Sequence, residues 1–147
     1  MSNEANKAIV MRFFDEYWNG RNFDTLGEYI SPDRVHHFGT KVEPQSHDHM
    51  RRMHVLWYDA LPDFRYHVEH LIAEGDKVAA FVTFAGTHTG THHVAGRTAP
   101  PSNRPLNEAE MFLFRIAGGK IVESWATWDR LGVLEQLGVP MKPSTPG

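Results

Sequence analysis

The 147-residue sequence contains no cysteine. This absence excludes disulfides, thiol nucleophiles, zinc–thiolate sites and iron–sulfur clusters. The sequence also lacks basic runs, and a net charge of -3 argues against nucleic acid as a partner. No apolar run approaches the roughly 20 residues that span a bilayer, so we expect no membrane partner.

Residues 1–8 are polar and include an acidic side chain, which does not fit a secretory signal peptide. We therefore expect a cytoplasmic protein. The length favours one domain with one core. No internal repeat or linker interrupts the sequence, which predicts a single domain over residues 1–147 with a loose tail over 140–147.

Apolar side chains recur with helical spacing in three early segments, residues 9–18, 23–30 and 48–61. Asn19-Gly20 and Pro62 supply stop signals for the first and third of these helices. A short last helix is predicted over residues 131–137.

The β pattern begins at Phe64. Alternating apolar residues and glycine-containing turns predict two hairpins, and their strands cover residues 64–73, 77–88, 108–116 and 120–128. Between the hairpins, residues 89–106 contain glycine, proline and polar residues and are predicted to form a long loop, a feature that is often functional. Helices followed by a meander of strands indicate an α+β fold.

Both faces of the predicted sheet are apolar. Phe112 and Phe114 lie on one face of their strand, and Met111 lies on the other. Apolar faces must be covered, and about three N-terminal helices can cover one of them. The other has to curl around a cavity or meet a second copy of the chain, so a homodimer is expected.

Several segments follow one another in a distinctive order and spacing: Leu61-Pro62-Asp63-Phe64, Gly86-Thr87-His88-Thr89-Gly90, Pro100-Pro101-Ser102-Asn103-Arg104-Pro105, Phe114-Arg115-Ile116, Gly119-Lys120-Ile121-Val122-Glu123-Ser124-Trp125, Trp128-Asp129 and Leu134-Glu135-Gln136-Leu137-Gly138. Together they resemble the SnoaL-like polyketide cyclase and ester cyclase family of the NTF2-like superfamily. The resemblance implies a cone-shaped barrel, a strongly curved and mostly antiparallel sheet around an aromatic pocket, with no metal or organic cofactor. It also implies an intramolecular aldol reaction, with Asp129 as the acid/base.

Asp129 follows the last strand with the same parity as Trp125, so the two side chains share a face if no bulge intervenes. A carboxylate beside an indole loses hydration, which raises its pKa and suits it to proton transfer. The alternative is that Asp129 caps the following helix. His88 ends an apolar strand, where it could polarise a carbonyl or bond to loop backbone.

The substrate-binding candidates line the predicted pocket. At most one of His36 and His37 can face inward, and we favour His37, which matches a histidine of the resembled family. Glu110 shares a strand face with Phe112, where a buried charge needs a partner or a function. The remaining candidates are aromatic residues, each of which could equally be core: Phe14, Trp57, Phe64, Phe81 and Trp125.

Ten histidines raise the alternative of a metal site. His67 and His70 have opposite parity on a strand, and no His-Glu-x-x-His motif is present. We therefore expect surface histidines and no metal.

These features favour an enzyme that acts on a small hydrophobic, carbonyl-bearing substrate by aldol cyclisation or isomerisation. Two alternatives use the same pocket. One is a non-catalytic protein that binds a small hydrophobic molecule, and the other is a hydrolase of lactones or epoxides.

Overall fold

The computed structural model describes residues 2–140. Its elements, in chain order, are α1 (Asn3–Arg12), the π-helix η1 (Phe13–Asn19), α2 (Leu26–Tyr29), β1 (Ile30–Phe38), β2 (Lys41–Pro44), α3 (His47–Ala60), β3 (Arg65–Glu74), β4 (Lys77–Thr87), β5 (His92–Val94), β6 (Arg97–Ala99), β7 (Pro105–Ala117), β8 (Lys120–Trp128) and α4 (Arg130–Gln136).

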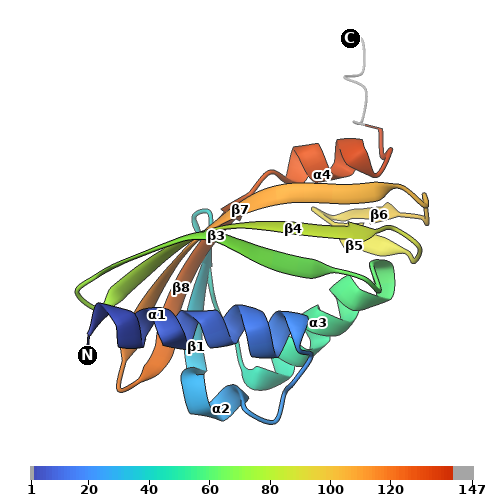
Figure 1. Cartoon of the computed structure of the whole chain (residues 1–147). Coiled ribbons are helices and arrows are strands. Elements are labelled where there is room, and N and C mark those ends of the chain that lie inside the picture. Colours follow the sequence, from blue (N-terminus) through green and yellow to red (C-terminus); the bar gives the residue numbers. More distant parts are fainter. Residues whose placement is uncertain (1, 141–147) are drawn as a thin grey trace.

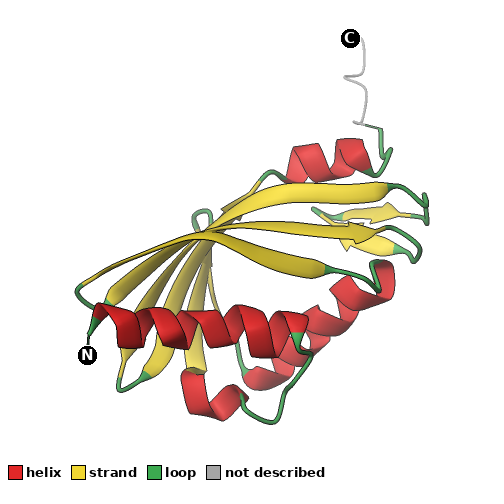
Figure 2. Ribbon diagram, viewed as in Figure 1, coloured by secondary structure: helices red, strands yellow, loops and turns green. Residues whose placement is uncertain are grey.

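Six strands form one sheet in the order β2-β1-β8-β7-β4-β3, and only the β1–β8 pair is parallel. The sheet is strongly bent, and α1, α2 and α3 lie on one side of it (Figure 1). Colouring by secondary structure shows the same layers, with α4 set apart from the other helices (Figure 2). The predicted α+β class, the curved sheet and the covering N-terminal helices are confirmed.

The first helix becomes π-helical at Phe13. The wider turn lets four nearby aromatic side chains, Phe13, Phe14, Tyr17 and Trp18, all be buried under the sheet. The helix ends at Asn19-Gly20 as predicted, and only glycine fits at position 20, because a Cβ there would lie 2.7 Å from the carbonyl oxygen of Asp15. The helix therefore delivers a wall of aromatic rings to the core.

Several segments differ from the sequence prediction, including the first helix, which begins at Asn3, and strand β2, which was not expected. Only Leu26–Tyr29 of the expected helix 23–30 is helical, and strand β1 begins at Ile30. The expected loop 89–106 contains the hairpin β5–β6, which turns at Ala95-Gly96 with φ of 51° and 73°. Two successive positive φ values are typical of a two-residue hairpin turn. Alanine at the first position is not the usual Asn or Asp, so the signal was weak in sequence.

Strand β7 alternates as predicted. Glu110, Phe112 and Phe114 are buried on the inner face, while Met111 is exposed on the outer face. Strand β8 does not alternate along its whole length, because its register with β7 shifts after Ile121. Ile116 pairs with Ile121 and Arg115 pairs with Glu123, so Val122 is an extra residue in β8. This bulge reverses the parity of everything that follows it.

Candidate functional site

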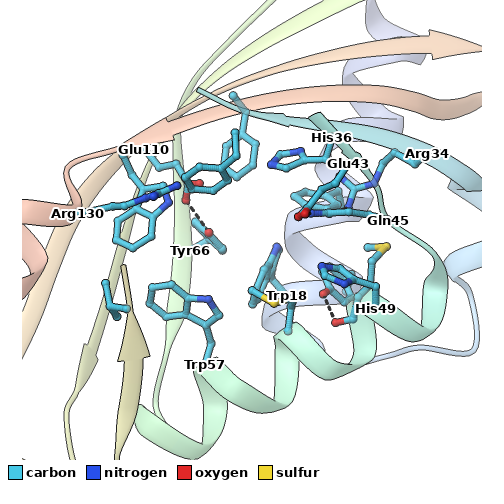
Figure 3. Close-up of a pocket in the computed structure, with 18 of the residues that line it drawn as sticks. Trp18, Arg34, His36, Glu43, Gln45, His49, Trp57, Tyr66, Glu110 and Arg130 are labelled. Atoms are coloured by element: carbon cyan, nitrogen blue, oxygen red, sulfur yellow. Dashed lines mark hydrogen bonds between the residues drawn. The ribbon is translucent and has the colours of Figure 1, made fainter. Parts of the chain in front are cut away.

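A cavity of about 320 Å³ lies between the π-helix, α3 and the inner face of the sheet. Most of its wall is aromatic, including Phe13, Tyr17, Trp18, Trp57 and Trp128. Two groups of polar side chains stand out among these rings, Glu110 with Tyr66 in one region and Arg34 with His36 in another (Figure 3). A cavity of this kind suits a hydrophobic ligand that carries a few polar groups.

Glu110 and Tyr66 form the first polar group. Glu110 is only 6% exposed, and its Oε1 accepts a hydrogen bond of 2.7 Å from the Tyr66 hydroxyl. Glu110 pairs with Val82 of β4 on one side and with Trp128 of β8 on the other, so it lies on a strand in the interior of the sheet. The carboxyl group therefore projects from a strand with neighbours on both sides into the aromatic cavity.

Burial controls the protonation of this pair. It raises the pKa of Glu110 to about 8, although the hydrogen bond from Tyr66 works in the opposite direction. Burial, together with the neighbouring carboxyl group, also raises the pKa of Tyr66 well above its ordinary value. At pH 7 Glu110 is therefore mostly a neutral acid, and a small shift of pH or environment ionises it.

Arg34, His36, Gln45 and Ser124 form the second polar group. Arg34 Nη1 donates to Ser124 Oγ at 2.8 Å, and Arg34 Nη2 donates to Gln45 Oε1 at 2.6 Å. His36 Nδ1 lies 2.7 Å from the same Ser124 Oγ. Ser124 Oγ already accepts from Arg34, so both groups are satisfied when its hydroxyl donates to His36 Nδ1, an arrangement that assigns the ring proton of His36 to Nε2.

The charges in this group are also set by burial. Burial, with the Arg34 charge beside it, lowers the pKa of His36 to about 3, so the ring is neutral at pH 7. Burial lowers the pKa of Arg34 to about 10, which leaves the guanidinium protonated. The group therefore presents a cation and a neutral N–H donor.

The residues predicted from sequence to bind substrate lie in three places. Trp57 and Glu110 line the cavity. Phe14 and Phe64 are buried in the core behind its wall, at 0% and 1% exposure. The others, His37, Phe81 and Trp125, lie on the outer face of the sheet, where His37 and Trp125 border a second, shallow hollow.

The structure corrects the choice between the two adjacent histidines. His36 lines the cavity, whereas His37 stacks on Trp125 with ring centroids 4.7 Å apart and pairs with Glu123 at 2.6 Å. His37 lies beside Trp125 because the two are register partners across β1 and β8. The bulge at Val122 turns Trp125 outward, and His37 follows it.

The two proposed catalytic residues lie away from the cavity wall. Asp129 is exposed, and its Oδ1 accepts a 2.8 Å hydrogen bond from the backbone N–H of Gly132 as the N-cap of α4. It shares the outward parity of Trp125. His88 is fully buried, and its Nδ1 accepts from the backbone N–H of Ser102 at 3.2 Å. Both positions fit the structural alternatives, while the catalytic role of each stays a prediction.

Several cavity residues were not predicted from sequence. Tyr66 follows the inward parity of Phe64 and could have been found from that alternation. Arg34, Gln45 and Arg130 offered no comparable signal, because isolated polar residues are normally exposed. Trp128 was hidden by the bulge in β8.

Three further expectations concern a second copy of the chain, a metal and a membrane. The outer hollow, which includes Ala79, Met111 and Leu113, is where we still predict that a second copy of the chain packs. Within residues 2–140, no three His, Cys, Asp or Glu side chains are grouped so that they could hold a metal ion. No helix in the same part of the chain has the length and apolarity needed to cross a membrane.

A bent sheet that encloses one aromatic cavity with helices defines the NTF2-like class of small-molecule-binding folds. The SnoaL-like polyketide cyclase model matches residues 8–137. The chain therefore belongs to the SnoaL-like polyketide cyclase family. No curated protein sequence matches it.

Solved structures agree with this assignment. TsrD from Streptomyces laurentii is 26% identical with a TM-score of 0.79, and the match covers 95% of this chain and 99% of TsrD. IdmH from Streptomyces antibioticus is 27% identical with a TM-score of 0.75, covering 91% and 99%. A SnoaL-like polyketide cyclase from Agrobacterium tumefaciens is 22% identical with a TM-score of 0.73, covering 94% and 100%, and supports the fold.

Proposed function

We propose that the protein is an acid/base catalyst of the cyclase or isomerase type, acting on a hydrophobic, carbonyl-bearing substrate of polyketide-like chemistry. One observation carries this proposal. The carboxyl group of Glu110 is buried inside an aromatic cavity, is hydrogen-bonded by Tyr66 and has a pKa raised to about 8. Carboxyl groups whose pKa lies near the working pH are suited to proton transfer.

Glu110 acts in its ionised form as the general base. A carboxylate whose conjugate acid has a pKa near 8 is a stronger base than an exposed one, and near pH 7 it is still ionised in part. It removes a proton from the carbon next to a substrate carbonyl, and the enolate carbon then bonds to a second carbonyl carbon. The proton held on Glu110 passes to the new alkoxide, which restores the carboxylate.

His36 supports the developing negative charge. Its ring is neutral and its proton is placed on Nε2, so this nitrogen donates to an oxyanion. A neutral imidazole is a suitable donor because it loses no proton to the enolate that it stabilises. In this proposal His36 takes the carbonyl-polarising role that the sequence analysis considered for His88.

Glu110 also replaces Asp129 as the first candidate for the base. Asp129 is exposed and accepts from backbone at the start of α4, an environment that leaves a carboxylate hydrated. The family resemblance nevertheless points to Asp129, so an experiment has to distinguish which of the two carboxyl groups is the base.

Deuterium exchange at the α carbon of 1-tetralone in D2O, followed by proton NMR, measures proton abstraction without the natural substrate. We expect Glu110→Gln to slow exchange by about a hundredfold or more, because an amide cannot accept the proton. Asp129→Asn is the matched control, since asparagine also caps helices, and it should exchange at close to the wild-type rate.

Each alternative predicts a different outcome. Exchange lost in Asp129→Asn and kept in Glu110→Gln would assign the base to Asp129. Equal exchange in all three proteins, above the buffer rate, would contradict both assignments. Binding of 1-tetralone with no exchange above the buffer rate is the behaviour of a non-catalytic binding protein.

A further inference from the structure

Arg34 is a buried cation whose partners are all neutral. Its side chain lies on β1 facing the cavity, and the residue is 3% exposed. The guanidinium donates to the Ser124 hydroxyl and the Gln45 amide oxygen, and it lies 5.8 Å from the centre of the Phe13 ring. None of the ion pairs formed within residues 2–140 includes Arg34.

A buried guanidinium with only neutral partners destabilises the folded protein unless a bound anion compensates for its lost hydration. Buried charges in proteins are normally paired, because the loss of hydration is not repaid by neutral partners alone. Only two of the five N–H donors of Arg34 have an acceptor in the described chain, and Nε is buried without one. These missing acceptors indicate that an anionic group binds beside the guanidinium of Arg34.

The surroundings of Arg34 also favour an anion. His36, with its ring proton assigned to Nε2, offers an N–H donor, and Trp18 Nε1 is a buried donor without a partner in the described chain. The cavity wall carries the arginines Arg34 and Arg130 and the acidic residues Glu43 and Glu110, and Glu110 is mostly protonated at pH 7. The charged side chains of the cavity wall therefore sum to a net charge of about +1, which favours an anionic ligand.

Glu43 is the candidate for an internal counter-ion, and the geometry argues against it. Its Oε1 accepts from Gln45 Nε2 at 3.3 Å, so the amide of Gln45 stands between this carboxylate and the guanidinium. Glu43 is also only partly buried. Its charge remains partly solvated and leaves the place beside Arg34 open to a ligand.

We propose that Arg34 binds a carboxylate group of the substrate, so that the molecule taken into the cavity is an aromatic or polyketide-like acid rather than a neutral ketone. The inference rests on the proposed function, because it names the substrate class of the same cavity. A planar carboxylate matches the fork of N–H donors on a guanidinium. With its acid group at Arg34, the substrate reaches from β1 toward Glu110 on β7 (Figure 3).

Two inert probes of the same shape test this inference. Anthraquinone-2-carboxylate and anthraquinone-2-carboxamide differ in charge but have nearly the same size. Their affinities are measured at pH 7 by quenching of tryptophan fluorescence, since Trp18, Trp57 and Trp128 line the cavity. We expect the carboxylate to bind about tenfold or more tightly than the amide, as charge-assisted hydrogen bonds predict.

Arg34→Met should abolish this preference and leave the affinity for the amide within about twofold. Arg130→Met is the matched control, because Arg130 also lines the cavity but is exposed and stacks on Phe38, and it should keep the preference. Circular dichroism verifies that each variant is folded. If Arg34→Met does not fold, the wild-type comparison still decides, because equal affinities for the two probes overturn the inference.

A preference that survives in Arg34→Met and disappears in Arg130→Met would also overturn the inference, since the anion would then be held at Arg130. The test is independent of the proposed chemistry, because the probes do not react. Loss of exchange in Glu110→Gln and loss of preference in Arg34→Met are therefore separate results.

Discussion

Replacing Glu110 with Gln should change how stability depends on pH. In the unfolded chain the carboxyl ionises near pH 4.5, whereas in the folded protein its pKa is raised to about 8. Between these values the folded state holds a proton that the unfolded state has lost, so Glu110 lowers the free energy of unfolding as pH rises. Each pH unit costs about 1.4 kcal/mol, which gives about 3 kcal/mol between pH 5 and pH 7.

The difference between the two proteins is the quantity to measure. Burial lowers the pKa of His36 and of His92, so these groups make the protein more stable as pH rises toward 6.5 and would mask the effect in wild type alone. Both proteins share them, and the subtraction removes them. Urea denaturation at pH 5, 6 and 7 gives the free energy of unfolding of each protein. A difference that stays constant over this range would show that Glu110 ionises normally, and the proposed base would lose its basis.

Further predictions concern the neighbours of Glu110 and the two sheet faces. Tyr66→Phe removes a hydrogen bond that lowers the pKa of Glu110, so the midpoint of tetralone exchange against pH should move above about 8, and an unchanged midpoint would contradict this coupling. Phe84→Ala should cost roughly 3–5 kcal/mol in urea denaturation, because Phe84 is 1% exposed. Phe81→Ala, on the outer face, should cost less than half as much at low protein concentration, and equal costs would refute the assignment of faces.

The sequence predicted the fold well because the signals were local and repeated. The alternation along β7 placed Glu110 with Phe112 and Phe114 on one face, and the structure buries all three. Helical spacing and Asn19-Gly20 located the first helix and its end. These patterns depend on residues close together in the chain, which is where sequence reasoning has most information.

The site was harder to predict because it depends on registers between distant strands. His36 faces the cavity and His37 faces outward only because β1 pairs with β8 so that His37 stands opposite Trp125. The direction of Trp125 depends on the extra residue Val122, which leaves no mark in the apolar pattern. Arg34 was missed for another reason. Sequence alone does not distinguish a buried arginine from an exposed one, because the difference depends on partners that are distant in the chain.

The bulge at Val122 has a consequence for how relatives are compared. A relative that keeps a residue at this position but pairs it regularly, without the bulge, turns the counterparts of Ser124 and Trp128 outward and their neighbours inward. Two chains aligned by letters alone can then seem to share a cavity tryptophan that only one of them has. Homology transfer of active-site residues across this family should therefore be anchored on strand register, residue by residue, and not on the Trp-Asp motif.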